Sequence, residues 1–140
     1  KPVPGAIEFV DWLAAHDFGD KLAIASTAIR RDIDIFLEKF GLSRFFPNER
    51  IIAKENVTRV KPHPEAFDKA FRTLGLPDSA RGQVLAFEDN PRGVLSAKSA
   101  GLFTCCITTA YSRQDLAKLD VPPDLIADSY DEFRELFQAA

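Results

Sequence analysis

Short apolar runs recur at regular intervals along the chain. They lie at residues 21–26, 50–53, 83–87, 102–108 and 124–127. Each run is rich in Ile, Val, Leu, Ala or Phe and is bounded by polar segments, which is typical of strands buried on both faces. The sequence therefore predicts five short β-strands.

The segments between these runs carry the periodicity of helices. Apolar residues there recur every three or four positions, with proline suited to the first turn of a helix and glycine suited to the position past its last turn. The expected helices are one opened by Pro4, one closed by Gly41, one between Pro64 and Gly75, one from Pro91 to Ala100, one capped by Ser112 and one over residues 130–137. This alternation predicts an α/β fold, a Rossmann-like parallel sheet with helices on both faces.

Size and charge narrow the class of protein. The chain has 140 residues, 46% of them hydrophobic, so we expect residues 1–140 to form a single domain with one core. The formal net charge of −3 and the absence of a basic block argue against nucleic-acid binding, and the apolar runs are too short to span a bilayer. Adjacent Cys105 and Cys106 point to opposite faces of a strand, so they make a poor disulfide and favour a reducing, cytoplasmic setting.

Polar side chains follow three of the predicted strands. Ser26 and Thr27 follow the first strand and stand directly before a helix, Lys61 lies in the loop after the second, and Glu88 and Asp89 follow the third. Ligands bind parallel sheets beyond the carboxyl ends of the strands. Taken singly, the hydroxyl residues are typical helix caps, the lysine a surface charge and the acids solvated. Taken together they predict a phosphate seat next to a pair of magnesium ligands.

Three ordered segments carry a resemblance to a known family. The segments "LAIAST", "VKPHPEAF" and "FEDNPRGVLSAKSAG" resemble the second, third and fourth motifs of the haloacid dehalogenase-like superfamily of phosphohydrolases. The branch concerned contains enzymes similar to phosphoglycolate phosphatase and beta-phosphoglucomutase. The resemblance implies a magnesium-dependent phosphatase acting on a small phosphorylated metabolite. It implies that Ser26 and Thr27 bind the phosphate, that Lys61 neutralises it, that Ser26 and Lys61 act in catalysis, and that Glu88 and Asp89 hold Mg²⁺.

The first motif of that family has no counterpart in this chain. In the family a strand ending in Asp-x-Asp supplies the nucleophile and occupies the centre of the sheet, between the strands that here end at Ser26 and Glu88. Asp32 and Asp34 have the right spacing, but their neighbours continue a helical pattern, so we expect both on a solvated helix flank. The cap domain, which selects the substrate in this branch, is also absent. We therefore expect the chain to be inactive alone, with an open slot in its sheet.

The sequence leaves several alternatives open. The chain begins with Lys1 and contains no methionine, so we expect it to start inside a longer reading frame, whose N-terminal segment would fill the slot. Another copy of the chain is the alternative occupant. A non-catalytic phosphate-binding, metal-binding or regulatory module is an alternative function, and a phosphomutase is another. A phosphorylation-receiver domain uses similar residues, but there the acids come first and the lysine last.

Overall fold

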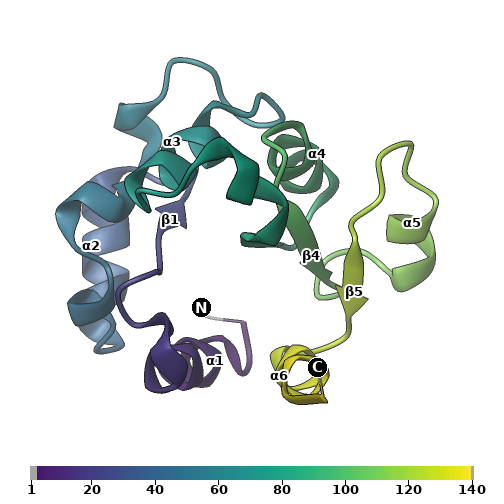
Figure 1. Cartoon of the computed structure of the whole chain (residues 1–140), viewed down its shortest axis with the longest axis horizontal. Helices are drawn as coiled ribbons and strands as arrows, with labels where there is room; N and C mark the ends of the chain where they lie inside the picture. Colours follow the sequence, from purple (N-terminus) through teal and green to yellow (C-terminus); the bar gives the residue numbers. More distant parts are fainter. Residues whose placement is uncertain (1–2, 140) are drawn as a thin grey trace.

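The computed structural model describes residues 3–139 and contains every strand and helix that the sequence predicts (Figure 1). The strands are β1 (Ile24–Ala25), β2 (Ile51–Ile52), β3 (Leu85–Glu88), β4 (Phe103–Ile107) and β5 (Leu125–Ala127). The α-helices are α1 (Ala6–Leu13), α2 (Arg30–Lys39), α3 (Glu65–Thr73), α4 (Pro91–Ser99), α5 (Arg113–Ala117) and α6 (Tyr130–Ala139). The segment Ala14–Phe18 follows α1 and leaves helical geometry at His16 and Asp17, and short 3₁₀ turns lie in the connections.

Local end signals explain several of the helix boundaries. Gly41 and Gly75 each adopt φ +70°, the left-handed conformation expected just past a helix end. The Ser112 hydroxyl accepts a hydrogen bond from the Asp115 N–H at 3.1 Å and caps α5, as predicted. Pro4 differs from prediction, because it lies in a turn and Gly5, at φ +81°, precedes the first helical residue.

The strands form two separate parallel sheets. One sheet pairs β1 with β2, and the other has the order β3-β4-β5. No backbone pairing joins β1 to β3. These are the two strands between which the sequence predicted an open slot, and that prediction is confirmed. β1 and β2 are also shorter than the predicted runs at 21–26 and 50–53, which accords with a sheet of only two strands.

Helices cover both faces of the strands. Phe9 of α1 and Phe133 of α6 pack on one face of the three-stranded sheet, against Cys105 and its neighbours. Val94 of α4 and Leu116 of α5 pack on the other face, against Cys106. The adjacent cysteines thus point to opposite faces, as predicted, and both are free thiols. In Figure 1, α1 and α6 lie together below the strands, and α3 and α4 lie above them.

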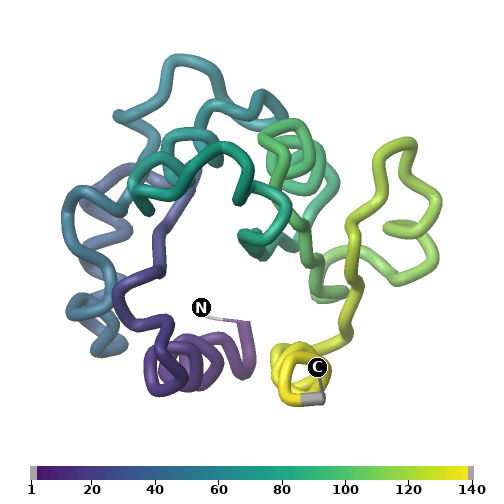
Figure 2. The backbone as a smooth tube through the Cα atoms, viewed as in Figure 1, coloured from purple at the N-terminus to yellow at the C-terminus, as the bar shows by residue number. Residues whose placement is uncertain are grey.

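Two helices span the gap between the sheets. On one face α1 contacts both sheets, because Phe9 packs with the β4 side chains and Val10 packs against the cluster that contains Ile51 of β2. On the other face α3 does the same, through Ala70 toward β1 and β2 and Phe71 toward β3. In Figure 2, α1 in purple and α6 in yellow lie on the opposite side of the strands from the teal segment that contains α3.

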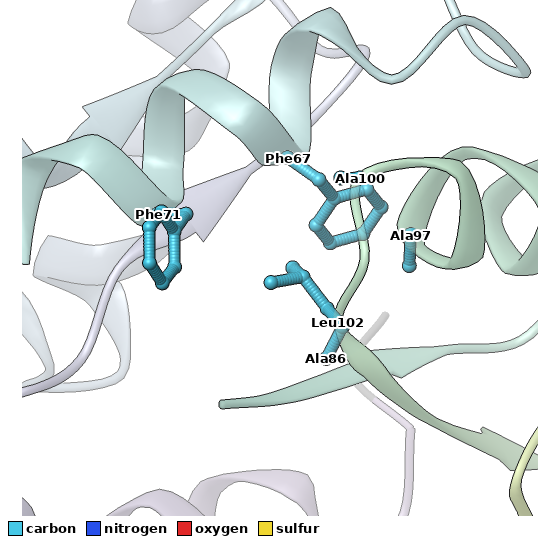
Figure 3. Packing of buried hydrophobic residues seen from close by; sticks show 6 residues of the cluster. All are labelled: Phe67, Phe71, Ala86, Ala97, Ala100 and Leu102. Atoms are coloured by element: carbon cyan, nitrogen blue, oxygen red, sulfur yellow. The ribbon is translucent and has the colours of Figure 1, made fainter. Parts of the chain in front are cut away.

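The gap is a cavity of about 340 Å³ lined by α1, β1, α3 and β3. Its upper wall is the cluster of Figure 3, in which Phe67 and Phe71 project from α3 toward Ala86 and Leu102. We call this cavity the slot. Its walls are mainly apolar, and Tyr130 of α6 closes one side. Between residues 3 and 139, no helix combines the length and the apolar character that crossing a membrane requires.

Alkaline pH is expected to destabilise the fold through its buried thiols. Burial raises the pKa of Cys105 and of Cys106 to about 12, from an ordinary value of 9.0. The folded chain keeps these protons where the unfolded chain loses them. The resulting stability is therefore complete below pH 9.0 and is lost as the pH rises toward about 12. The urea midpoint should be lower at about pH 10.5 than at about pH 8.

The matched control is the double variant Cys105→Ala/Cys106→Ala, in which this fall should be smaller. An equal fall in the parent chain and the double variant would show that the thiols do not contribute to the pH dependence.

Candidate functional site

A second cavity, of about 740 Å³, opens at the carboxyl ends of the strands. All five residues predicted for the site line it: Ser26, Thr27, Lys61, Glu88 and Asp89. Ser26 follows β1 and Glu88 ends β3, so the carboxyl ends of these two strands open into the same cavity. The remaining lining residues are Ala25, Asn90, Pro91, Arg92 and Tyr111. We call this cavity the polar cavity.

Lys61 is the central cation of the polar cavity. Its Nζ donates to Glu88 Oε2 at 2.6 Å and to the Ala25 carbonyl at 3.2 Å. The ammonium also lies 4.6 Å from the centroid of the Phe67 ring. The Lys61 and Glu88 side chains are only 11% and 9% exposed. Lys61 therefore joins the end of β1 to the end of β3 through a buried ion pair.

The loop before α3 is held so that Lys61 points into the cavity. The Glu65 carboxylate accepts the backbone N–H groups of Thr58 and Arg59, and these hydrogen bonds lower its pKa to about 2. From α4, the buried Ser96 hydroxyl donates to the His63 carbonyl at 2.7 Å. The loop is thereby tied both to its own helix and to the helix that follows Asp89.

The acid pair is fixed by the first turn of α4. Asn90 caps that helix, because its Oδ1 accepts the Gly93 N–H at 2.9 Å. The Asn90 amide also donates to Asp89 Oδ1 at 2.8 Å. Gly93 leaves room for the other acid, since a Cβ on this residue would lie 2.0 Å from Glu88 Oε1. The close approach at Gly93 is therefore a contact with the Glu88 side chain.

The surroundings of Ser26 differ from prediction. The sequence placed Ser26 and Thr27 directly before a helix, but α2 begins only at Arg30. The Ser26 hydroxyl accepts the Ala28 N–H at 3.1 Å and does not cap the helix. The first N–H of α2, on Arg30, instead donates to both carboxylate oxygens of Glu55, at 2.9 and 3.1 Å. The carboxylate of Glu55 therefore lies at the N-terminus of α2.

The site offers magnesium two carboxylates of the right chemical type. Glu88 and Asp89 both line the polar cavity, and carboxylate oxygens are the ligands that Mg²⁺ prefers. Glu88 gives one oxygen to Lys61, and Asp89 gives one to the Asn90 amide. Within residues 3–139, no group of three or more His, Cys, Asp or Glu residues is placed to hold a metal. The residues present fit the ion but supply only part of a coordination shell.

The two aspartates considered as a substitute nucleophile lie elsewhere. Asp32 and Asp34 are both exposed on α2, and Asp34 pairs with Arg30 at 2.8 Å. Their predicted place on a helix flank is confirmed. Neither lines the polar cavity.

Adding a methyl group at Gly93 is expected to displace the acid pair. The variant Gly93→Ala must push Glu88 away from its position beside Lys61, and overpacking of this kind costs about 1–3 kcal/mol. The matched control is Gly82→Ala, because a Cβ on Gly82 meets no atom within 4 Å. Chemical unfolding should show the loss for Gly93→Ala alone. Equal stability of the two variants would contradict this account of Gly93.

The sequence of the chain is similar to those of several known proteins. The chain is 32% identical over 136 residues to the pyrophosphatase PpaX of Halalkalibacterium halodurans, spanning 97% of this chain and 60% of that protein. It is 36% identical over 114 residues to the protein CbbY of Rhodobacter capsulatus, spanning 81% of this chain and 48% of that protein. The chain therefore spans about half to three fifths of these relatives.

A solved structure gives the same fold. The crystal structure of CbbY from Rhodobacter sphaeroides in complex with phosphate superposes with a TM-score of 0.74 at 26% identity, covering 93% of this chain and 55% of that one. The family model described as haloacid dehalogenase-like hydrolase matches residues 1–107. That match extends from the N-terminal residue through all three motif segments and β4. The chain belongs to the haloacid dehalogenase-like hydrolase family.

Proposed function

We propose that this chain is the phosphate- and metal-binding part of a magnesium-dependent phosphatase that acts on small phosphorylated compounds. The observation that carries the proposal is the placement of Lys61. Its ammonium donates to Glu88 and to a carbonyl at the end of β1, and Ser26 and Thr27 line the same cavity. The family assignment supports the reaction class.

Each residue has a role that its chemistry allows. Ser26 and Thr27 hydroxyls donate hydrogen bonds to phosphate oxygens, and Lys61 offsets the negative charge of the transferred group. Glu88 and Asp89 would hold Mg²⁺, with phosphate and water completing its ligands. When bound, the ion supplies Lewis-acid stabilisation of the phosphoryl oxygens. The contact with Lys61 fixes one oxygen of Glu88, and the Asn90 amide fixes one of Asp89.

The described residues leave the nucleophile unassigned. Hydrolysis of phosphate monoesters requires accelerations of up to about 10²¹, and a carboxylate nucleophile helps by splitting the reaction into two steps. We propose that this carboxylate comes from a strand that enters the slot between β1 and β3. The slot is lined by the facing edges of two parallel strands and by apolar side chains of α1 and α3, which suits a strand buried on both faces.

The occupant of the slot would be a segment outside these 140 residues or a second copy of the chain. We favour a separate segment, because closing the sheet without one would require α1 and α3 to repack. One observation favours a non-catalytic module, namely the lack of a third metal-binding side chain among residues 3–139. A phosphomutase would use the same site residues.

The chain alone is expected to show no magnesium-dependent turnover of an aryl phosphate, because the slot lacks its strand. Adding an apolar peptide that ends in Asp-x-Asp should raise the melting temperature and give measurable turnover. A peptide with both aspartates replaced by asparagine is the control, and it should stabilise the fold without activity. Robust turnover by the chain alone would contradict the proposal and make Asp32 the first residue to replace.

Loss of a metal ligand should raise the Mg²⁺ concentration that is needed for half-maximal activity. In the peptide-supplemented chain, Asp89→Asn should reduce the apparent affinity for Mg²⁺ by about tenfold or more. Titration of activity against Mg²⁺ measures this change. Asp34→Asn is the control, because Asp34 is exposed on α2 and does not line the polar cavity. Unchanged activity of Asp89→Asn at limiting Mg²⁺ would remove Asp89 from the metal site.

Lys61→Ala should lower turnover by about 100-fold, because it removes the cation that faces the phosphate. It should also lower the free energy of unfolding by about 3 kcal/mol, since it leaves the buried Glu88 carboxylate without its partner. The double variant Lys61→Ala/Glu88→Gln isolates the effect on stability. It should regain the lost stability, because no buried charge is left unpaired. Full activity of Lys61→Ala would make Lys61 a structural residue only.

A further inference from the structure

Two residues outside the predicted set line the wall of the polar cavity. Arg92 lies in the first turn of α4, and Tyr111 lies in the connection between β4 and α5. They come from different parts of the chain. Both are exposed, with Tyr111 at 42%. Arg92 therefore adds a second cation to the cavity that already contains Lys61.

The Arg92 guanidinium has no partner among residues 3–139. Most other arginines of the chain are committed to a carboxylate, a carbonyl or a ring nitrogen: Arg30, Arg44, Arg50, Arg59, Arg72, Arg81, Arg113 and Arg134. Lys61, the other cation of the cavity, already uses two of its three donors, on Glu88 and on the Ala25 carbonyl. Arg92 is thus the cation in the cavity wall whose donors all remain available among the described residues.

The position of Arg92 in α4 does not favour a positively charged side chain. It is the second residue of α4, where the positive end of the helix dipole disfavours a cation. No acidic residue in the first turn of α4 offsets it. An anion bound at this wall would be attracted by both the guanidinium and the helix end.

We infer that Arg92, assisted by Tyr111, binds a second anionic group of the substrate, at a distance from the phosphate held by Lys61 and Ser26. The guanidinium presents a planar fork of donors that matches a carboxylate or a phosphate. The phenol of Tyr111 can donate one more hydrogen bond. The substrate class is then a phosphorylated compound with a second negative group. This inference rests on the proposed function, because it takes the first phosphate as bound at Lys61.

Three non-hydrolysable probes test it. Methylphosphonate has one anionic group, phosphonoacetate adds a carboxylate, and methylenediphosphonate adds a second phosphonate. Titration calorimetry of the 140-residue chain, in magnesium buffer of fixed ionic strength, measures the three affinities. We expect at least one of the probes with two anionic groups to bind about tenfold more tightly than methylphosphonate. The tighter of these two probes identifies the second group as a carboxylate or a phosphate.

Substitutions distinguish binding by the Arg92 side chain from a general effect of positive charge on the protein. In Arg92→Gln the tenfold advantage should disappear while methylphosphonate affinity changes by less than about twofold. Tyr111→Phe should reduce the advantage in part. Arg31→Gln is the matched control, because Arg31 is an exposed arginine of α2 that does not line the polar cavity, and it should leave all three affinities unchanged.

The contrary outcomes are distinct. If methylphosphonate binds and the second group adds nothing, the inference is wrong and the phosphate seat stands. If the tighter binding of the probes with two anionic groups survives in Arg92→Gln, or is lost equally in Arg31→Gln, Arg92 does not bind the second group. If no probe binds the wild-type chain, the inference and the proposed phosphate seat both fail.

Discussion

The facing edges of β1 and β3 carry backbone donors and acceptors, and the two edges do not pair with each other. The helices hold them apart, because Phe9 and Val10 of α1 fill one side of the slot and Phe67 and Phe71 of α3 fill the other. Closing the sheet would require these side chains to leave their positions in the core. The separation of β1 and β3 therefore sets the geometry at the carboxyl edge, where every candidate site residue lies.

Lys61 occupies the end of that separation. Its ammonium donates one hydrogen bond to the Ala25 carbonyl, at the end of β1. It donates another to the Glu88 carboxylate, at the end of β3. Both side chains of the ion pair are nearly buried, so each charge depends on the other to offset its loss of water. The same contact keeps a cation and a carboxylate next to the space where a phosphate and a metal ion would meet. Structural and functional demands on Lys61 thus coincide.

Much of this arrangement was predictable from local patterns. The five apolar runs and the helical periodicities are short-range signals, and each became a strand or a helix. The site residues were found because parallel strands bring their carboxyl ends to one edge, so that order along the chain implied proximity. The family resemblance added the position of the open slot, which the two-sheet topology then confirmed.

What the sequence missed depends on contacts between distant segments. Glu55 accepts the first N–H of α2, on Arg30, although it lies 25 residues further along the chain. No local sequence pattern predicts such a hydrogen bond. Arg92 reaches the polar cavity from the first turn of α4 and Tyr111 from the connection between β4 and α5, and only the fold defines the relative position of these two segments. The length of β1 was overestimated for a related reason. Its apolar run predicted a buried strand, but backbone pairing also needs a neighbour, and β1 has one on a single side.

The most direct test of the account is a map of cross-strand contacts in solution. Nuclear Overhauser effects between backbone protons report which strands are adjacent. The account predicts contacts between Ala25 and Ile52 and between Ala86 and Thr104, following the observed registers, and none between the backbones of Ala25 and Ala86. Backbone contacts between β1 and β3 in the isolated chain would show a closed sheet, and would contradict both the slot and the function proposed for it.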